Sequence, residues 1–399
     1  MADAAGSSCQ SRGSRTRLTV GEIFRTYGRT YKQRHPVSPQ QAKVMHALMQ
    51  CRTAALGGHV YTCTRCAHET PMYNSCRDRH CPTCQNLDQA RWLAERQARV
   101  LPVRHFHVVF TLPQELRAVA MAYPEPLYEL LLRCAAATLV ELGRDPKRLG
   151  AHLGVTAVLH TWTRELRFHP HAHCVVTAGG LAASGSPRWI HTSPDFLFPV
   201  HVMSRLFRGK FLDGLQELHR AGQLGCELTR NQPWADLRQQ LYAKGWVVYA
   251  KAPFAGAEHV FQYLGRYTHR VGISNQRLLS ADEQGVSFYT KNGNTCTLEP
   301  DEFMRRFLLH VLPRGFRKIR HYGLLAASNV NTKLAQARAL LPTSSQPASF
   351  DPALTWQKLL DQLTGVDVST CPACGAATLA CKSIPAARAG SAKMAWDTS

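Results

Sequence analysis

Two pairs of closely spaced cysteines constrain the fold of this chain more than any other feature of its sequence. The pairs are Cys63 with Cys66 in CTRC and Cys81 with Cys84 in CPTC, and fourteen residues separate them. Thiolates spaced as C-x-x-C are typical ligands of a tetrahedral Zn²⁺ ion, and a small module around such an ion folds only when the metal is bound. We therefore expect the two pairs to meet at one structural zinc.

Further potential zinc ligands lie close to these pairs. Two cysteines and two histidines could form a second zinc site: Cys51, His59, Cys76 and His80. The alternative is that they are surface histidines and a buried thiol. The sequence thus predicts one Zn²⁺ ion, or two if this group binds a metal.

A distal cysteine pair resembles half of a zinc knuckle. It lies in CPACG, from Cys371 to Gly375, and only Cys381 follows it. A second chain or a distant residue would have to complete a zinc site here. We expect this pair to be unliganded or structural.

The charge of the chain points to a polyanionic partner. The 399 residues carry 48 Lys and Arg against 27 Asp and Glu, a formal charge of +21, and DNA or RNA is the first candidate for a partner. A hydrophobic content of 45% is typical of a globular protein. The most apolar stretch, 127–142, is interrupted by charges, so we expect no membrane association and a cytoplasmic, nucleoid-associated protein. The fourteen cysteines then favour metal ligation over disulfides.

The pattern of strands and helices predicts an α+β fold. Apolar, β-branched runs predict strands over 105–113, 155–162, 166–176 and 245–250, and a Gly/Ser/Pro loop is expected over 179–188. Amphipathic stretches between them predict helices, including 202–219, 257–270 and 301–312. The short link Thr163–Glu165 between two strands implies antiparallel pairing. We therefore expect an antiparallel sheet with helices packed on it, preceded by the small zinc module.

Three histidines alternate along the predicted strand 166–176. In RFHPHAHCVV, the side chains of His169, His171 and His173 point to one face and the apolar residues between them to the other. His171 and His173 flank a single hydrophobic residue, a geometry that can hold one divalent ion between adjacent imidazoles. The strand therefore predicts a metal site.

Two tyrosines are spaced by one helical turn in the predicted helix 257–270. Tyr263 and Tyr267 share one face with His259 four residues earlier, and Arg266 and Arg270 lie beside them. A metal that polarises a phosphoryl oxygen makes the phosphorus susceptible to attack by a phenol, which leaves a covalent phosphotyrosine. Mg²⁺ or Mn²⁺ suits such a site. The alternative is that one tyrosine packs in the core and the other covers the surface.

Several of these blocks together resemble a known family. HPHAHCVV, YLGRYTHRV, NSCRDRHCPTCQ, FHVVFTLP and RRFLLHVLPRGFRKIRHYG are similar to the IS91 family of bacterial insertion-sequence transposases, over about residues 24–340. These are two-tyrosine enzymes with an HUH nuclease domain and an N-terminal zinc-binding domain. The resemblance implies that His171 and His173 are the metal pair and that Tyr263 and Tyr267 are the nucleophiles. It also implies single-stranded DNA at element ends as substrate, 5′-phosphotyrosine links and a rolling-circle route.

The third metal ligand and the domain organisation complete these expectations. His259 is the candidate for the third ligand, with His169 and Gln262 as alternatives. We expect four parts, which are a disordered tail (1–17), a helical and zinc-binding domain (18–100), the HUH nuclease domain (103–325) and a C-terminal tail with a cysteine pair (326–399). The oligomeric state stays open.

A basic stretch near the end of the nuclease domain is a candidate for binding DNA. In PRGFRKIRHYG, four cations alternate with two aromatic residues, and the cations are Arg314, Arg317, Lys318 and Arg320. Such cations neutralise phosphates, and the rings of Phe316 and Tyr322 could stack on unpaired bases. The alternative is a solvated basic face with two core aromatic residues.

Two other functions fit part of these features. A plasmid or phage replication initiator or a relaxase uses the same histidine and tyrosine chemistry, whereas the zinc module favours a transposase. A non-catalytic, zinc-dependent DNA-binding regulator explains the charge and the cysteines. It does not explain three histidines on one strand face with a tyrosine pair downstream.

Overall fold

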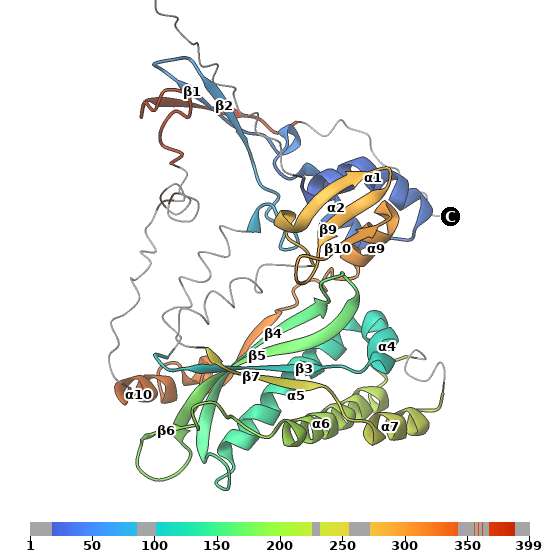
Figure 1. Ribbon diagram of the computed structural model, residues 1–399, viewed down its shortest axis with the longest axis vertical. Coiled ribbons are helices and arrows are strands. Elements are labelled where there is room, and N and C mark those ends of the chain that lie inside the picture. Colours follow the sequence, from blue (N-terminus) through green and yellow to red (C-terminus); the bar gives the residue numbers. More distant parts are fainter. Residues whose placement is uncertain are drawn as a thin grey trace, which may run out of the picture.

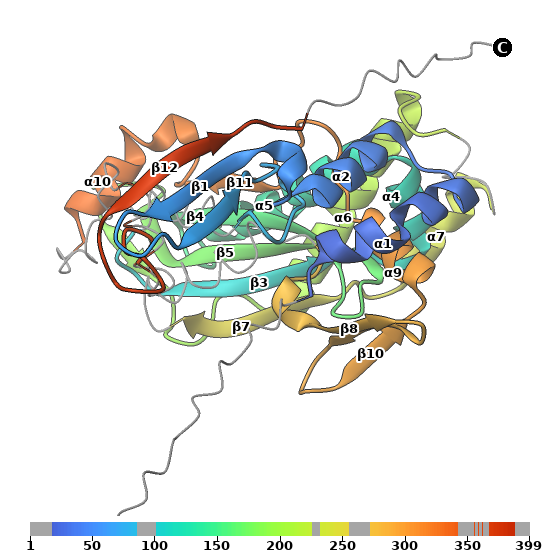
Figure 2. The ribbon, with the colours of Figure 1, turned by 90° about the horizontal axis from the view of Figure 1, so that it is seen from above.

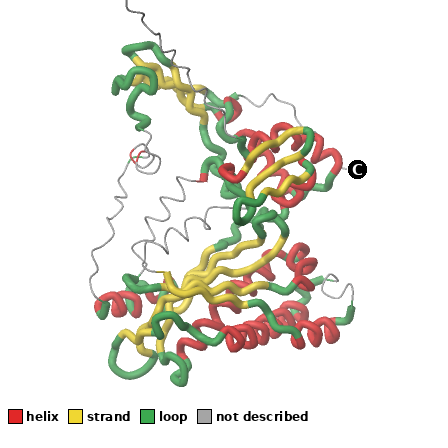
Figure 3. Tube along the Cα trace, in the orientation of Figure 1, coloured by secondary structure: helices red, strands yellow, loops and turns green. Residues whose placement is uncertain are grey.

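The computed structural model describes residues 18–85, 101–225, 232–254, 272–341 and 367–387, with positions 355, 358 and 361. Its architecture is α+β, with antiparallel sheets and helices packed against them, which confirms the predicted class (Figures 1 and 3). The tail 1–17 and the tyrosine-bearing segment 257–270 lie outside the described residues. Within the described part, no helix combines the length and hydropathy needed to span a membrane.

The largest layer is a six-stranded antiparallel sheet. The strand order is β11-β4-β5-β3-β7, and the short β6 pairs with β5. The strands are β3 (His105–Thr111), β4 (Ala151–Trp162), β5 (Phe168–Ala182), β6 (Trp189–His191), β7 (Val248–Phe254) and β11 (Ile319–Gly323). The antiparallel pairing of β4 with β5, expected from the short link between them, is confirmed.

The turn between β4 and β5 is held by Thr163. Its hydroxyl accepts hydrogen bonds from the backbone N–H groups of Glu165 and Arg167, and its own N–H donates to the carbonyl of Arg167. Leu166 has a φ of 60°, the left-handed conformation that closes the turn. This local network fixes the two strands side by side and so sets which residues face each other across them.

Strand β5 is longer than the sequence indicated. We expected a loop over 179–188, whereas β5 continues to Ala182 and pairs with both β4 and β6 there. Glycine makes this close pairing possible, because a Cβ on Gly180 would lie 2.4 Å from the carbonyl oxygen of His152 and one on Gly179 would lie 2.5 Å from that of Ile190. Gly179 and Gly180 suggested a loop, but their missing side chains allow the backbones of the neighbouring strands to approach β5 closely.

Helices cover one face of this sheet, as Figure 1 shows for α5 and α6. The helices are α4 (Arg117–Ala122), α5 (Pro124–Arg144), α6 (Val200–Arg220) and α7 (Trp234–Ala243), with α10 (Lys333–Ala339) at the end of the sheet. The apolar stripe of α6 contributes Phe207 and Phe211 to the main core, where the ring of Phe207 packs 4.9 Å from that of Phe110 in β3. The α5–α6 layer leaves the opposite face of the sheet for other groups.

A second core joins residues from distant parts of the chain. Its elements are α1 (Val20–Arg34), α2 (Pro39–Gln50), β8 (Leu278–Asp282), β9 (Gly285–Tyr289), β10 (Thr295–Leu298) and α9 (Pro300–Leu308). Capping boxes at Thr19 and Ser38 start α1 and α2. The rings of Phe24 and Phe307 meet at 5.5 Å. This core therefore unites the expected zinc-binding domain with part of the expected nuclease domain.

A small three-stranded sheet brings together the N-terminal and C-terminal parts of the described chain. The strands are β1 (Gly58–Cys63), β2 (Glu69–Tyr73) and β12 (Leu379–Ile384), and both outer strands pair antiparallel with β1. Figure 2 shows β12, in red, running beside β1, in blue. We call these strands and their flanking cysteine turns the ribbon.

Candidate functional site

The cysteines form two groups, and their membership differs from the expected one. The two C-x-x-C pairs do not meet each other. One group unites the pair from CTRC with the distal pair, and its members are Cys63, Cys66, Cys371 and Cys374. The other unites the pair from CPTC with two single cysteines, and its members are Cys51, Cys76, Cys81 and Cys84. The expected grouping of Cys63 and Cys66 with Cys81 and Cys84 is thus wrong.

The physical reason lies in the ribbon. The turn after β1 carries Cys63 and Cys66, and the turn before β12 carries the distal pair, so the pairing of β12 with β1 brings the two turns together. Of the two ways of completing the distal pair, a second chain or a distant residue, the structure shows the second, because Cys63 and Cys66, more than 300 residues away, complete the group.

The sulfur positions fit tetrahedral zinc. The Sγ atoms of Cys63 and Cys374 are 3.6 Å apart, those of Cys66 and Cys371 are 3.7 Å apart, and those of Cys76 and Cys84 are 3.7 Å apart. A tetrahedron with Zn–S bonds of about 2.3 Å places its sulfurs about 3.8 Å from each other. Both groups can therefore hold Zn²⁺, and each is made of thiolate donors, which zinc favours.

Neither histidine of the expected second zinc site belongs to these groups. His80 is buried, with its Nδ1 2.8 Å from the carboxylate of Asp78 and its Nε2 accepting the N–H of Leu312 at 3.1 Å. Both ring nitrogens are occupied, so the imidazole is a structural link rather than a zinc ligand. His59 is an exposed residue of β1. Of the expected second site, only Cys51 and Cys76 are retained.

Histidines gather on the face of the main sheet opposite α5 and α6. In β5, the half-buried His169, His171 and His173 alternate with residues buried in the main core, which confirms the predicted division of faces. His160 of β4 lies directly across from His171. His160, His171 and His173 bring their ring nitrogens within 4.8 Å of one another and form what we call the histidine group.

Neighbouring groups orient the rings of the histidine group. The Nδ1–H of His171 donates to the carbonyl oxygen of His169 at 2.6 Å, which leaves Nε2 with the lone pair that a metal needs. The Nδ1 of His173 lies 2.8 Å from Nε2 of His107 on β3, and their rings are parallel. The ring of Trp162 stacks on His160 at 4.7 Å. Packing from three strands thus fixes the imidazoles.

Burial keeps these imidazoles neutral. Desolvation lowers the pKa of His171 to about 4 and holds the pKa values of His160 and His173 well below the ordinary value. Neutral imidazole is the form that ligates metals. The residues present therefore fit a divalent cation that accepts imidazole nitrogens as ligands.

Among the described residues, the third member of the histidine group is His160, which was not among the metal ligands expected from the sequence. Both His259 and Gln262, two of the expected candidates, lie outside the described residues, while His169 is not in the group. A signal was present in the sequence. The short link between the strands implies a hairpin, and a hairpin places His160 near the histidines of the next strand.

The basic stretch 313–323 is divided between surface and interior. Arg314 and Arg317 are exposed. Arg320 forms a two-pronged ion pair with Glu129 of α5 and lies over the ring of Phe316.

The two aromatic residues of this stretch are not exposed stacking surfaces. Phe316 is buried against Tyr128, and burial raises the pKa of the half-buried Tyr322 to about 12. These positions agree with the alternative of core aromatic residues.

Lys318 lies at the entrance to β11, next to the histidine group. Its carbonyl accepts the N–H of Leu159, the residue before His160. Burial, followed by the charge of Arg79, lowers the pKa of Lys318 to about 7. Its charge acts on His160 and contributes to lowering the pKa of that residue. Tyr263, Tyr267, Arg266 and Arg270 lie outside the described residues.

Comparisons with known proteins agree with these features. Residues 154–333 match the family described as "Putative transposase", and residues 23–112 match the family described as "Transposase zinc-binding domain". The chain is 45% identical to "Putative transposase y4qJ" of Sinorhizobium fredii, over 89% of this chain and 92% of that protein. It is 28% identical to "Transposase for insertion sequence element IS801" of Pseudomonas savastanoi pv. phaseolicola, over 84% of this chain and 82% of that protein. No solved structure matches the chain significantly.

The group of Cys51, Cys76, Cys81 and Cys84 lies inside the matched zinc-binding family, and the histidine group lies inside the matched transposase family. An identity of 45% that extends over most of both chains shows that this chain and the Sinorhizobium fredii protein belong to one family. The chain therefore belongs to the IS91 family of transposases and carries the zinc-binding domain of that family.

Proposed function

We propose that this transposase nicks single-stranded DNA at the ends of its element through a tyrosine and transfers the strand by a rolling-circle route. The observation that carries the proposal is the histidine group, three neutral imidazoles within 4.8 Å of one another on the face of an antiparallel sheet opposite α5 and α6. A metal site of this kind has no evident purpose in a protein that only binds DNA.

The histidine group would hold the ion. His171 and His173 offer ring nitrogens from one strand and His160 offers one from the next. A bound Mg²⁺ or Mn²⁺ ion polarises a phosphoryl oxygen and supports the charge that develops there. The backbone carbonyl of His169 fixes the tautomer of His171, so its donor atom is ready before the metal arrives.

Tyr263 and Tyr267 are the proposed nucleophiles. The phenol oxygen forms a bond to phosphorus, the bond from phosphorus to the 3′-oxygen breaks, and the proton lost by the phenol balances the one gained by the 3′-hydroxyl. The 5′-phosphotyrosine keeps the energy of the phosphodiester, so the strand can be rejoined without ATP. Two tyrosines allow one to hold the cleaved strand while the other cuts a second strand.

DNA contacts would come from cations around this site. We propose that Arg266 and Arg270 bind phosphates beside the tyrosines and that the exposed Arg314 and Arg317 bind the strand farther along. Lys318, whose charge acts on His160, would attract the phosphate towards the histidine group. The nucleoid in the bacterial cytoplasm is the place where such a protein would act.

The test is the formation of SDS-stable adducts with labelled single-stranded DNA in the presence of Mn²⁺. The wild-type chain should form them, and the double variant Tyr263→Phe, Tyr267→Phe should form none. Each single variant should lose strand transfer. Tyr242→Phe, at an exposed tyrosine of α7, is the matched control and should behave as wild type.

Two results would count against the proposal. Adducts that persist in the double variant would remove the tyrosines from the mechanism. An absence of adducts on every strand tested, including candidate element ends, would favour a DNA-binding regulator without catalysis. Transfer of element ends between supercoiled plasmids would separate a transposase from a replication initiator, which nicks its own origin.

A further inference from the structure

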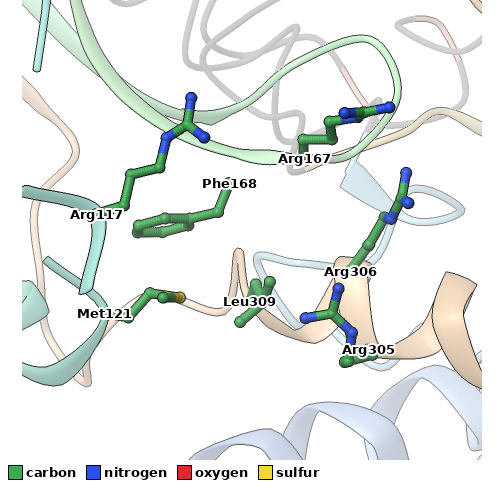
Figure 4. A pocket seen from close by; sticks show the side chains of 7 residues that line it. All are labelled: Arg117, Met121, Arg167, Phe168, Arg305, Arg306 and Leu309. Carbon is green, nitrogen blue, oxygen red and sulfur yellow. The ribbon is translucent and has the colours of Figure 1, made fainter. Parts of the chain in front are cut away.

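A pocket rich in arginine lies where the β4–β5 turn meets α4 and α9. Its volume is about 350 Å³, within the size of sites for small organic ligands, roughly 300–1,000 Å³. Four of its residues are arginines, namely Arg117, Arg167, Arg305 and Arg306. Figure 4 shows the ring of Phe168 between Arg117 on one side and Arg305 and Arg306 on the other.

Three of the arginines are held in place by two carboxylates. Glu302 forms ion pairs with both Arg305 and Arg306, and Glu165 pairs with Arg167 at 2.9 Å. Four positive charges therefore face two negative ones, so the pocket keeps a net positive charge. Arg306 is the best positioned of the three, because its side chain is only 17% exposed and also donates to the carbonyl oxygen of Glu165, so it would lose little conformational freedom on binding an anion.

Arg117 is the arginine without such a partner among the described residues. It is exposed at the start of α4, and its charge helps to lower the pKa of Glu115, a carboxylate that forms its ion pair with Lys244 instead. Its charge contributes to lowering the pKa of His169, whose carbonyl orients His171. Arg117 therefore lines the pocket and also lies close enough to His169 to act on it, and its exposed guanidinium can reach an anion from solvent.

The pocket also offers an apolar surface. Met121 is 47% exposed, a large value for an apolar side chain, and it lies with Phe168 and Leu309 in the lining (Figure 4). Cations beside an apolar and aromatic surface are what a nucleotide requires, because its phosphate is anionic and its base is flat and apolar on both faces.

The pocket and the histidine group lie at the same end of β5 but on different faces. Phe168 and His171 are three residues apart, about 10 Å along the strand, and their side chains point to opposite faces of the sheet, so a DNA strand would reach both by passing around the end of β5. We infer that this pocket binds one nucleotide of the single strand that reaches the histidine group, with its phosphate at Arg117 and its base against Met121. The inference rests on the proposed function for the identity of that strand and adds a subsite that selects unpaired DNA.

Binding measurements on the full, zinc-loaded chain test this inference. The probes are a fluorescein-labelled oligo(dT) and a strand of the same length that lacks bases, both measured by anisotropy without added Mg²⁺ or Mn²⁺. Arg117→Gln should weaken oligo(dT) binding roughly ten-fold. It should also reduce the slope of log affinity against log salt concentration by about 0.7, the value for one phosphate contact on a single strand.

The base is tested separately. The wild type should bind oligo(dT) more tightly than the abasic strand, and Met121→Ala should reduce that ratio without weakening the abasic strand. Arg220→Gln, at the exposed end of α6, is the matched control for loss of one positive charge and should leave both affinities near wild type.

Each contrary outcome overturns the inference. Wild-type affinity and salt dependence in Arg117→Gln would exclude a phosphate at this residue. Equal binding of the two probes by the wild type, or equal loss of both in Met121→Ala, would exclude a base in the pocket. Neither measurement involves cleavage, so a failure of the adduct experiment and a failure here are distinguishable.

Discussion

Replacing Cys374 by serine should remove one zinc ion and unfold only the ribbon. The two cysteine groups share no residue, so the wild-type chain should contain two zinc ions and Cys374→Ser should contain about one. If the C-x-x-C pairs met each other instead, Cys374 would lie outside every zinc site and the same variant would keep its full metal content. The substitution therefore separates the two arrangements.

The size of the local effect follows from how little the ribbon buries. Among the residues of β1, β2 and β12, only Gly58 and Cys63 are buried. With so little apolar burial, the zinc must supply most of the stability, and metal binding in small cysteine sites contributes about 10–16 kcal/mol. By contrast, Cys81 and Cys84 belong to the second core. Loss of the ribbon zinc should thus leave both large cores intact.

The assay combines metal analysis with limited proteolysis. Cys374→Ser should lose one zinc per chain, and residues 367–387 should be cleaved much faster, while the main thermal transition stays within a few degrees of wild type. Cys381→Ser is the matched control, because this exposed cysteine of β12 belongs to neither group. Retention of two zinc ions by Cys374→Ser, or loss of one by Cys381→Ser, would refute the reasoning.

Three further predictions concern the nuclease domain. First, burial lowers the pKa of His310 to about 4 from an ordinary 6.5, so neutral His310 stabilises the fold fully above about pH 6.5. About 3 kcal/mol of this stability should be lost as pH falls to about 4, and urea unfolding should show a flatter pH dependence for His310→Gln than for wild type. Second, Arg317→Gln should weaken oligonucleotide binding and its salt dependence more than Arg320→Gln does, because Glu129 already pairs with Arg320; equal effects in anisotropy would contradict this. Third, His160→Ala should lower the yield of Mn²⁺-dependent adducts about ten-fold or more, and an unchanged yield on denaturing gels would exclude it as a ligand.

Much of the fold followed from local patterns. Alternation along 166–176 identified the inward face of β5, and the link Thr163–Glu165 identified the hairpin, because both signals depend on residues close in sequence. The end of β5 was missed because glycine is common both in loops and where strands approach closely. Gly179 and Gly180 belong to the second kind.

Contacts between distant segments were not accessible in the same way. Cys66 and Cys371 meet because β12 pairs with β1, and no local pattern around CTRC favours the distal pair over the nearer CPTC. Similarly, α1 and α9 share a core through Phe24 and Phe307, although each sequence shows only that one helix face is apolar. Local patterns show which face of a helix or strand is buried, but the element that packs against that face depends on the whole chain.

The ribbon joins two segments of the chain that are synthesised at different times. Cys66 and Cys371 are 305 residues apart, and ribosomes add roughly 5–20 residues per second. A growing polypeptide therefore carries half of a zinc site for about 15–60 s before its complement emerges. During translation those first thiols are open to oxidation or to the wrong metal, and a product released early can never close the ribbon. The complete ribbon can therefore form only after synthesis has passed Cys374.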